Sequence, residues 1–76
     1  MYEVIGIERR QYTNKQGRQV SGYNLFLTYE KKNCDGLACF EQWSGDGPVK
    51  DSGVDVGDKV EILYNRYGKV ESFRIV

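Results

Sequence analysis

Aromatic and basic residues stand close together at several points along this chain of 76 residues. Near its end, Arg66, Tyr67 and Lys69 surround Gly68, and further back Phe26 interrupts a polar run. Single-stranded nucleic acid presents unstacked bases and a row of phosphates, so its binders use flat rings for the bases and cations for the backbone. This arrangement of rings and cations therefore favours binding of an unpaired strand over catalysis of a reaction.

Rings and cations from several segments are candidates for such binding. Strand alternation places Phe26 on the face opposite a row of leucines, and hairpin geometry places Tyr67 at a turn, so both rings are expected to stack on bases. The cations expected to contact phosphates are Arg9, Lys15, Arg18, Arg66, Lys69 and Arg74.

The same residues also fit plainer roles. The basic side chains are ordinary for a protein surface, and the turn around Gly68 also fits a role limited to joining two strands or contacting a second subunit. Trp43 fits a position over the core as well as an exposed one. A protein-interaction module, or an RNA-binding barrel that uses nearly the same residues, therefore remains an alternative.

The residue types argue against catalysis. The chain contains no histidine, no glycine-rich phosphate loop that opens a helix, and no serine or cysteine next to an evident base. Cys34 and Cys39 have no companion ligands for zinc, and the carboxylates around segment 44–57 match no calcium-loop pattern. We therefore expect no enzyme activity, no metal, no cofactor and no small-molecule substrate.

Size and charge set further limits. The 11 basic and 11 acidic residues balance, so no overall positive field attracts a polyanion and any nucleic-acid binding must rest on local patches. So small a chain buries only about 60% of its unfolded surface, which makes a stabilising homodimer plausible.

No run approaches the roughly 18 apolar residues of a membrane span, and no signal peptide is evident, so we expect a cytoplasmic protein without membrane contact.

Short runs of Val, Ile, Tyr and Phe, interrupted by turn residues, predict an all-β chain with a single domain over residues 1–76. Strict alternation in the second run places Tyr23, Leu25, Leu27 and Tyr29 on the core face. Gly6 is expected to let the first strand bend. The expected strands cover residues 2–13, 18–30, 37–43, 58–66 and 69–76.

Segment 44–57 separates the third and fourth expected strands. It is rich in glycine and contains the only proline, so we expect a loop that is too interrupted for a stable helix. No internal repeat is evident along the chain.

The number and order of the strands predict a small β-barrel. Five antiparallel strands with a curled first strand, and a gap between the third and the fourth, fit a partly open Greek-key barrel of the OB type. An SH3-like barrel has a similar number of strands and a similar length. Patterning alone does not separate these two folds.

Two stretches of the sequence resemble a known family. "QGRQVSGYNLFLTYE" (16–30) and "VGDKVEILYNRYGKVESFRIV" (56–76) resemble the basic wing and the closing hairpin of the small, phage-type single-stranded DNA-binding, helix-destabilising proteins, a family that includes the gene V protein of filamentous phage. The resemblance covers under half of the chain. Val20 stands where the wing of the family has a tyrosine.

The resemblance implies a function and an assembly. It implies an OB-like homodimer that coats single-stranded DNA with little sequence preference, as a replication accessory of a phage or mobile element in a bacterial host. It assigns Tyr67 to the stacking aromatic of the loop tip, Arg18 to a basic residue of the wing and Arg74 to an arginine of the last strand.

Overall fold

The computed structural model describes residues 1–76 and contains five strands and one short helix. The all-β prediction is confirmed. The first strand has the expected bounds, and the ends of the others differ from the expected ends by at most two residues. The elements are β1 (Tyr2–Thr13), β2 (Gln19–Tyr29), β3 (Ala38–Gly45), α1 (Asp46–Ser52), β4 (Lys59–Tyr64) and β5 (Val70–Ile75).

The strands form one antiparallel sheet in the order β3-β2-β1-β4-β5. β1, β2 and β3 follow one another, and β4 returns to lie beside β1, which is the spatial order of a Greek key. This order agrees with the Greek-key topology expected for an OB-type chain. The sheet does not close into a barrel, because no ladder joins β3 to β5.

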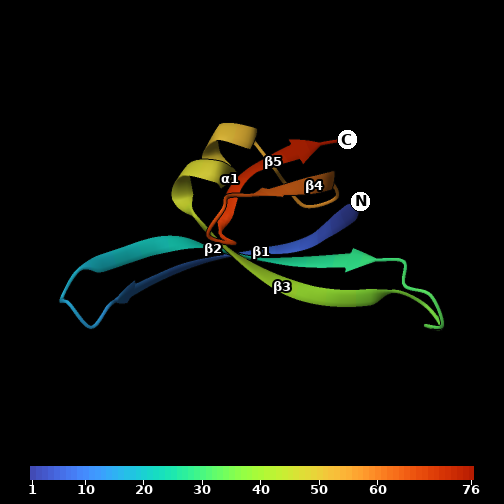
Figure 1. Cartoon of the computed structure of the whole chain (residues 1–76), viewed down its shortest axis with the longest axis horizontal. Coiled ribbons are helices and arrows are strands. Elements are labelled where there is room, and N and C mark those ends of the chain that lie inside the picture. The colour runs from blue at the N-terminus through green and yellow to red at the C-terminus, as the bar shows by residue number, and fades with distance from the viewer.

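The molecule is elongated, with extents of 44 × 25 × 22 Å. β1, β2 and β3 form a long curved layer, and β4, β5 and α1 lie together on one side of it (Figure 1). Beyond the Gly22–Gly45 pair, β1 and β2 continue without a third strand. This projecting hairpin, residues 11–21, is called the wing below.

The core lies between the two layers. Its completely buried apolar side chains are Val4, Leu25, Leu27 and Val60. Alternation in β2 directs Leu25 and Leu27 inwards as predicted. Tyr23 and Tyr29 on the same face are half-buried; Tyr23 packs against the core, and the Tyr29 ring contacts the rings of Tyr2 and Phe40. The predicted bend in β1 is also present, because the register with β2 shifts between Val4 and Gly6.

The expectation of a helix-free loop at 44–57 is wrong, because Asp46–Ser52 forms α1. Pro48 is compatible with the helix since it lies in the first turn, where backbone N–H groups have no helical partner. Gly53 ends the helix in the left-handed conformation, and its N–H donates to the carbonyl of Val49 at 3.1 Å. Burial of Val49 and Val54 supplies the packing that a helix this short requires.

The side chain of Asp46 fastens the start of α1 to the sheet, since its Oδ2 accepts a hydrogen bond of 2.6 Å from Ser21 Oγ on β2. With seven residues, α1 is far shorter than a membrane-spanning helix, and no other helix is present.

Candidate nucleic-acid interface

Two of the basic segments form turns with the same sequence pattern, Asn-basic-x-Gly-basic. They are "NKQGR" at 14–18, at the tip of the wing, and "NRYGK" at 65–69, between β4 and β5. Gly17 and Gly68 both adopt a φ of 77°, which is readily available only to glycine. We call these segments the wing turn and the hairpin turn.

An asparagine holds each turn in the same way. In the wing turn, Asn14 Oδ1 accepts hydrogen bonds from the backbone N–H groups of Gln16 and Arg18, both at 3.0 Å. In the hairpin turn, Asn65 Oδ1 accepts from Tyr67 at 2.9 Å and from Lys69 at 3.1 Å.

The main-chain hydrogen bonds of the two turns also correspond. Asn14 N donates to Arg18 O at 2.8 Å, and Asn65 N donates to Lys69 O at 2.8 Å. Each turn therefore has a defined backbone that presents one cation before the glycine and one after it. This five-residue turn pattern is visible in the sequence, although it is too short to be an internal repeat of the fold.

Tyr67 is the most open ring at the hairpin turn, with 70% of its surface exposed. The guanidinium of Arg66 lies 4.9 Å from the centre of its ring, and Arg66 Nη2 donates to Tyr67 Oη at 2.7 Å. Lys69 lies two residues further on. The structure thus brings together Arg66, Tyr67 and Lys69, as the sequence predicted.

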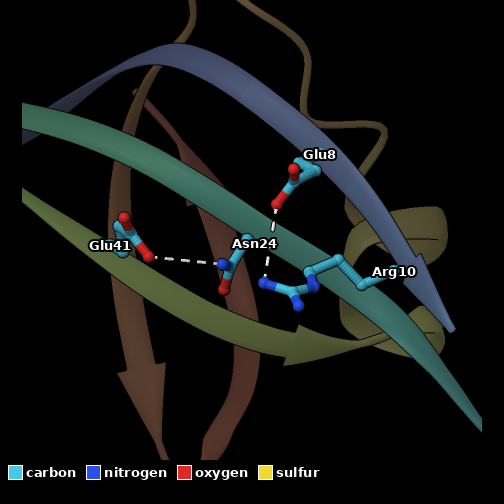
Figure 2. A network of polar contacts seen from close by, with 4 residues as sticks. All are labelled: Glu8, Arg10, Asn24 and Glu41. Atoms are coloured by element: carbon cyan, nitrogen blue, oxygen red, sulfur yellow. Dashed lines mark hydrogen bonds and ion pairs between the residues drawn. The ribbon is translucent and has the colours of Figure 1, made fainter. Parts of the chain in front are cut away.

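The face of β1, β2 and β3 that points away from β4, β5 and α1 is called the outer face. In Figure 2, its polar side chains stand on the near side of the three strands, with the other elements behind them. The register and the alternation of the strands place these residues on it: Gly6, Glu8, Arg10, Tyr12, Asn24, Phe26, Glu41 and Trp43.

Phe26 is half-buried on the outer face. Its ring leans over Gly6, where a β-carbon would lie only 3.2 Å from Phe26 Cδ2. Its direct cross-strand neighbours are Gly6 and Glu41. Phe26 is therefore on the predicted face, but its cross-strand neighbours include no cation; among the outer-face positions, the nearest cation along β1 is Arg10.

Trp43 and Tyr12 form a second aromatic position on the outer face, at the base of the wing. Their ring centres lie 5.8 Å apart, and half of Tyr12 is exposed. The indole covers Gly22, where a β-carbon would come within 2.7 Å of Trp43 Cζ2. Neither ring was among the site residues predicted from the sequence, although alternation along the third strand places Trp43 on the same face as Glu41.

A groove of about 420 Å³ opens between the end of β3, α1 and the hairpin turn. It lies where the sheet is not closed. Trp43 and Lys69 are both among its lining residues, so the groove runs between the end of β3 and the hairpin turn. The lining residues are Gln42, Trp43, Ser44, Gly45, Pro48, Asn65, Gly68, Lys69 and Val70.

A hydrogen bond joins β4 to β3 beside this groove. Tyr64 Oη donates to Gln42 Oε1 at 3.0 Å, and Gln42 Nε2 donates in turn to the carbonyl of Trp43 at 2.9 Å. Partial burial, with a further contribution from Tyr2, raises the pKa of Tyr64 above its ordinary value of 10.0. Tyr64 therefore keeps its proton, and its role as a donor, at physiological pH.

Of the predicted cations, only Lys69 lines the groove. Arg9 and Arg74 also lie outside the two basic turns. Arg9 is a cross-strand partner of Tyr23 and is on the opposite face of the sheet from Phe26. Arg74 is four positions after Val70 along β5, which separates it from the hairpin turn by about 13 Å. It forms an exposed ion pair of 3.9 Å with Glu61. Lys15 and Arg18 are at the tip of the wing.

A second hollow, of about 560 Å³, lies at the other end of β2 and contains none of the predicted site residues. Its charged lining residues are Glu3, Glu30 and Lys59. Cys34 and Cys39 are free thiols, and no group of three or more acidic or cysteine side chains is arranged to hold a metal ion.

Comparison with known proteins identifies no relative. No protein-family model matches the chain, and no curated protein or solved structure matches it. The resemblance to phage-type single-stranded DNA-binding proteins stays a prediction, and the functional conclusion depends on the geometry described above.

Proposed function

We propose that this protein binds single-stranded DNA without reading a defined sequence and performs no catalysis. The observation that supports this proposal most is the pair of matched basic turns, one of which carries the exposed ring of Tyr67 and borders a groove. Cations held by a defined turn suit phosphates, and open rings suit unpaired bases.

The balanced charge of the chain makes this binding local. With 11 acidic and 11 basic residues, the attraction must come from the turns, each of which presents two cations. Each phosphate contact on a single strand contributes about 0.7 to the slope of log affinity against log salt concentration. Contacts from all four turn cations would give a slope of roughly −3.

The rings supply the remainder of the affinity. Tyr67 is exposed at the hairpin turn, and Tyr12 and Trp43 contact each other at the base of the wing. Phe26 offers a further ring on the outer face. Removal of one stacking ring typically costs about 1 to 3 kcal/mol of binding free energy.

The proposal includes a homodimer in a replication role for a phage or mobile element, in the cytoplasm of a bacterial host. The small core contains only seven buried apolar side chains, and burial of more surface between two copies would stabilise it. The outer edges of β3 and β5 are unpaired within the chain and are available for such association.

The test is a fluorescence titration of a labelled oligothymidylate at low and moderate salt concentration. The parent is expected to bind more weakly as salt rises, and Tyr67→Ala should bind roughly tenfold or more weakly than the parent at low salt. Leu37→Ala is the control, since it shortens an exposed apolar side chain in the β2–β3 connection. Absence of binding at low salt, or binding indifferent to salt and to Tyr67→Ala, would reject the function.

A protein-interaction role is the second candidate, because the free edges of β3 and β5 can each accept an added peptide strand. Recovery of one defined protein after nuclease treatment, with no oligonucleotide binding, would favour it. RNA binding would use the same rings and cations, and RNA and duplex competitors in the titration separate it from DNA binding.

A further inference from the structure

A mixed polar network lies on the outer face between Phe26 and Trp43. Asn24 Nδ2 donates to Glu41 Oε2 at 3.3 Å, and Arg10 Nη1 lies 3.8 Å from Glu8 Oε1 (Figure 2). The four side chains come from three adjacent strands. Two carboxylates and one guanidinium leave this part of the face with one net negative charge.

The two carboxylates differ in how far their charge and their hydrogen-bond acceptors are already satisfied by the protein. Glu8 lies beside Arg10, which offsets its charge. Glu41 accepts only the amide of Asn24, on Oε2, and no side chain or backbone group of the protein donates to its Oε1. An ionised carboxylate can only accept hydrogen bonds, so Glu41 presents a free acceptor to whatever lies on this face.

The free acceptor of Glu41 belongs to a residue that lies beside Phe26. The two residues are direct cross-strand partners, and side chains at such positions have β-carbons about 4.5 to 5.5 Å apart on the same face. A base stacked on Phe26 therefore has its edge within reach of Glu41. A phosphate at the same place would be repelled, so this part of the face suits the bases of the strand rather than its backbone.

We propose that Glu41 gives this face a preference for cytosine over thymine. Cytosine carries an exocyclic amino group, N4–H₂, at the position where thymine carries the acceptor O4. The Glu41 carboxylate accepts a hydrogen bond from the first and repels the second. Asn24 acts as a positioning residue, because its hydrogen bond to Oε2 orients the Glu41 carboxylate. This inference rests on the proposed function, and it concerns base composition and not a defined sequence.

The experiment compares oligodeoxycytidylate and oligothymidylate of equal length at mildly alkaline pH, where cytosine is unprotonated and does not pair with itself. The parent is expected to bind the cytosine strand roughly threefold to tenfold more tightly, as for one additional hydrogen bond. Glu41→Gln should bring this ratio close to one and strengthen binding of the thymine strand, because a negative charge is removed. A strand of N4,N4-dimethylcytosine, which lacks the donors, should bind the parent no better than the thymine strand.

Glu30→Gln is the matched control, since it removes an exposed carboxylate just after β2 and outside the network. It should keep the parental ratio. Equal affinities of the parent for the two strands, or a Glu41→Gln variant that strengthens both equally, would overturn the inference while leaving DNA binding intact. Failure to bind either strand at low salt would instead overturn the proposed function.

Discussion

Asn65 contacts no ligand in the proposal, yet it holds the two residues of the hairpin turn that do. Its Oδ1 accepts the N–H groups of Tyr67 and Lys69. Asn65→Ala removes this acceptor, and we expect a loss of about 1 kcal/mol of unfolding free energy, together with weaker binding of oligothymidylate. Denaturant unfolding and the fluorescence titration measure the two effects.

Asn14→Ala is a matched variant for this prediction, because Asn14 makes the same bonds in the wing turn. It should lower stability by a similar amount. Its effect on binding should be smaller, since the wing turn contains no aromatic ring. Full binding by Asn65→Ala would show that the hairpin turn does not need a fixed backbone to hold DNA.

We expect Tyr64 to make the stability of the protein sensitive to alkaline pH. Its folded-state pKa lies above 10.0 because of burial and, to a smaller extent, Tyr2. Below pH 10 both the folded and the unfolded states keep the proton, so the contribution of Tyr64 is fully present. As the pH rises through the folded pKa, the unfolded chain loses its proton first and the stability contribution is lost.

We expect Tyr64→Phe to show a shallower fall of the urea midpoint above pH 10 than the parent. At neutral pH it should cost about 1 kcal/mol, because its hydrogen bond to Gln42 is removed. Urea unfolding at a series of pH values measures both quantities. A parental pH profile in the variant would show that Tyr64 does not contribute to the alkaline loss.

Among the elements, the pairing of β2 with β3 depends on the absence of a side chain at Gly22. A β-carbon there would lie 2.5 Å from the carbonyl oxygen of Ser44 and 2.7 Å from the indole of Trp43. The ring can shift, but the backbone carbonyl of the paired strand cannot. Gly22→Ala should therefore destabilise the protein by about 1 to 3 kcal/mol, as measured by denaturant unfolding, and should change the fluorescence of Trp43.

Gly47→Ala provides the contrast for this prediction. No atom lies within 4 Å of a β-carbon at Gly47, and alanine is the better helix former. We expect it to be neutral or to stabilise the protein by up to about 1 kcal/mol. A neutral Gly22→Ala would show that β3 moves away without cost, and that the indole does not depend on this glycine.

The strands were predictable from sequence because alternation and turn residues are local properties. α1 was not, because its formation depends on contacts of Val49 and Val54 with the core, which no local pattern shows. The hairpin turn was predicted for the same local reason as the strands. The contact of Tyr12 with Trp43 was not predicted, since it depends on the register of three strands taken together.

At the scale of the whole molecule, zero net charge makes the two basic turns separable contributors to binding. The wing turn lies at the tip of a projecting hairpin and the hairpin turn lies beside the groove. A strand long enough to contact both is held at two points, and release of one turn leaves the other to retain it. The paired variants Lys15→Gln with Arg18→Gln, and Arg66→Gln with Lys69→Gln, remove one turn at a time.

Each pair should lower the salt slope of oligothymidylate binding by about 1.4, as two phosphate contacts on a single strand contribute, and the two reductions should add. Lys31→Gln with Lys32→Gln removes the same charge from the exposed β2–β3 connection and is the control. If this control lowers the slope as much as the turn variants do, the attraction is a general effect of charge. If only the turn variants lower it, the strand contacts both turns, and an oligomer too short to reach both should respond to only one pair.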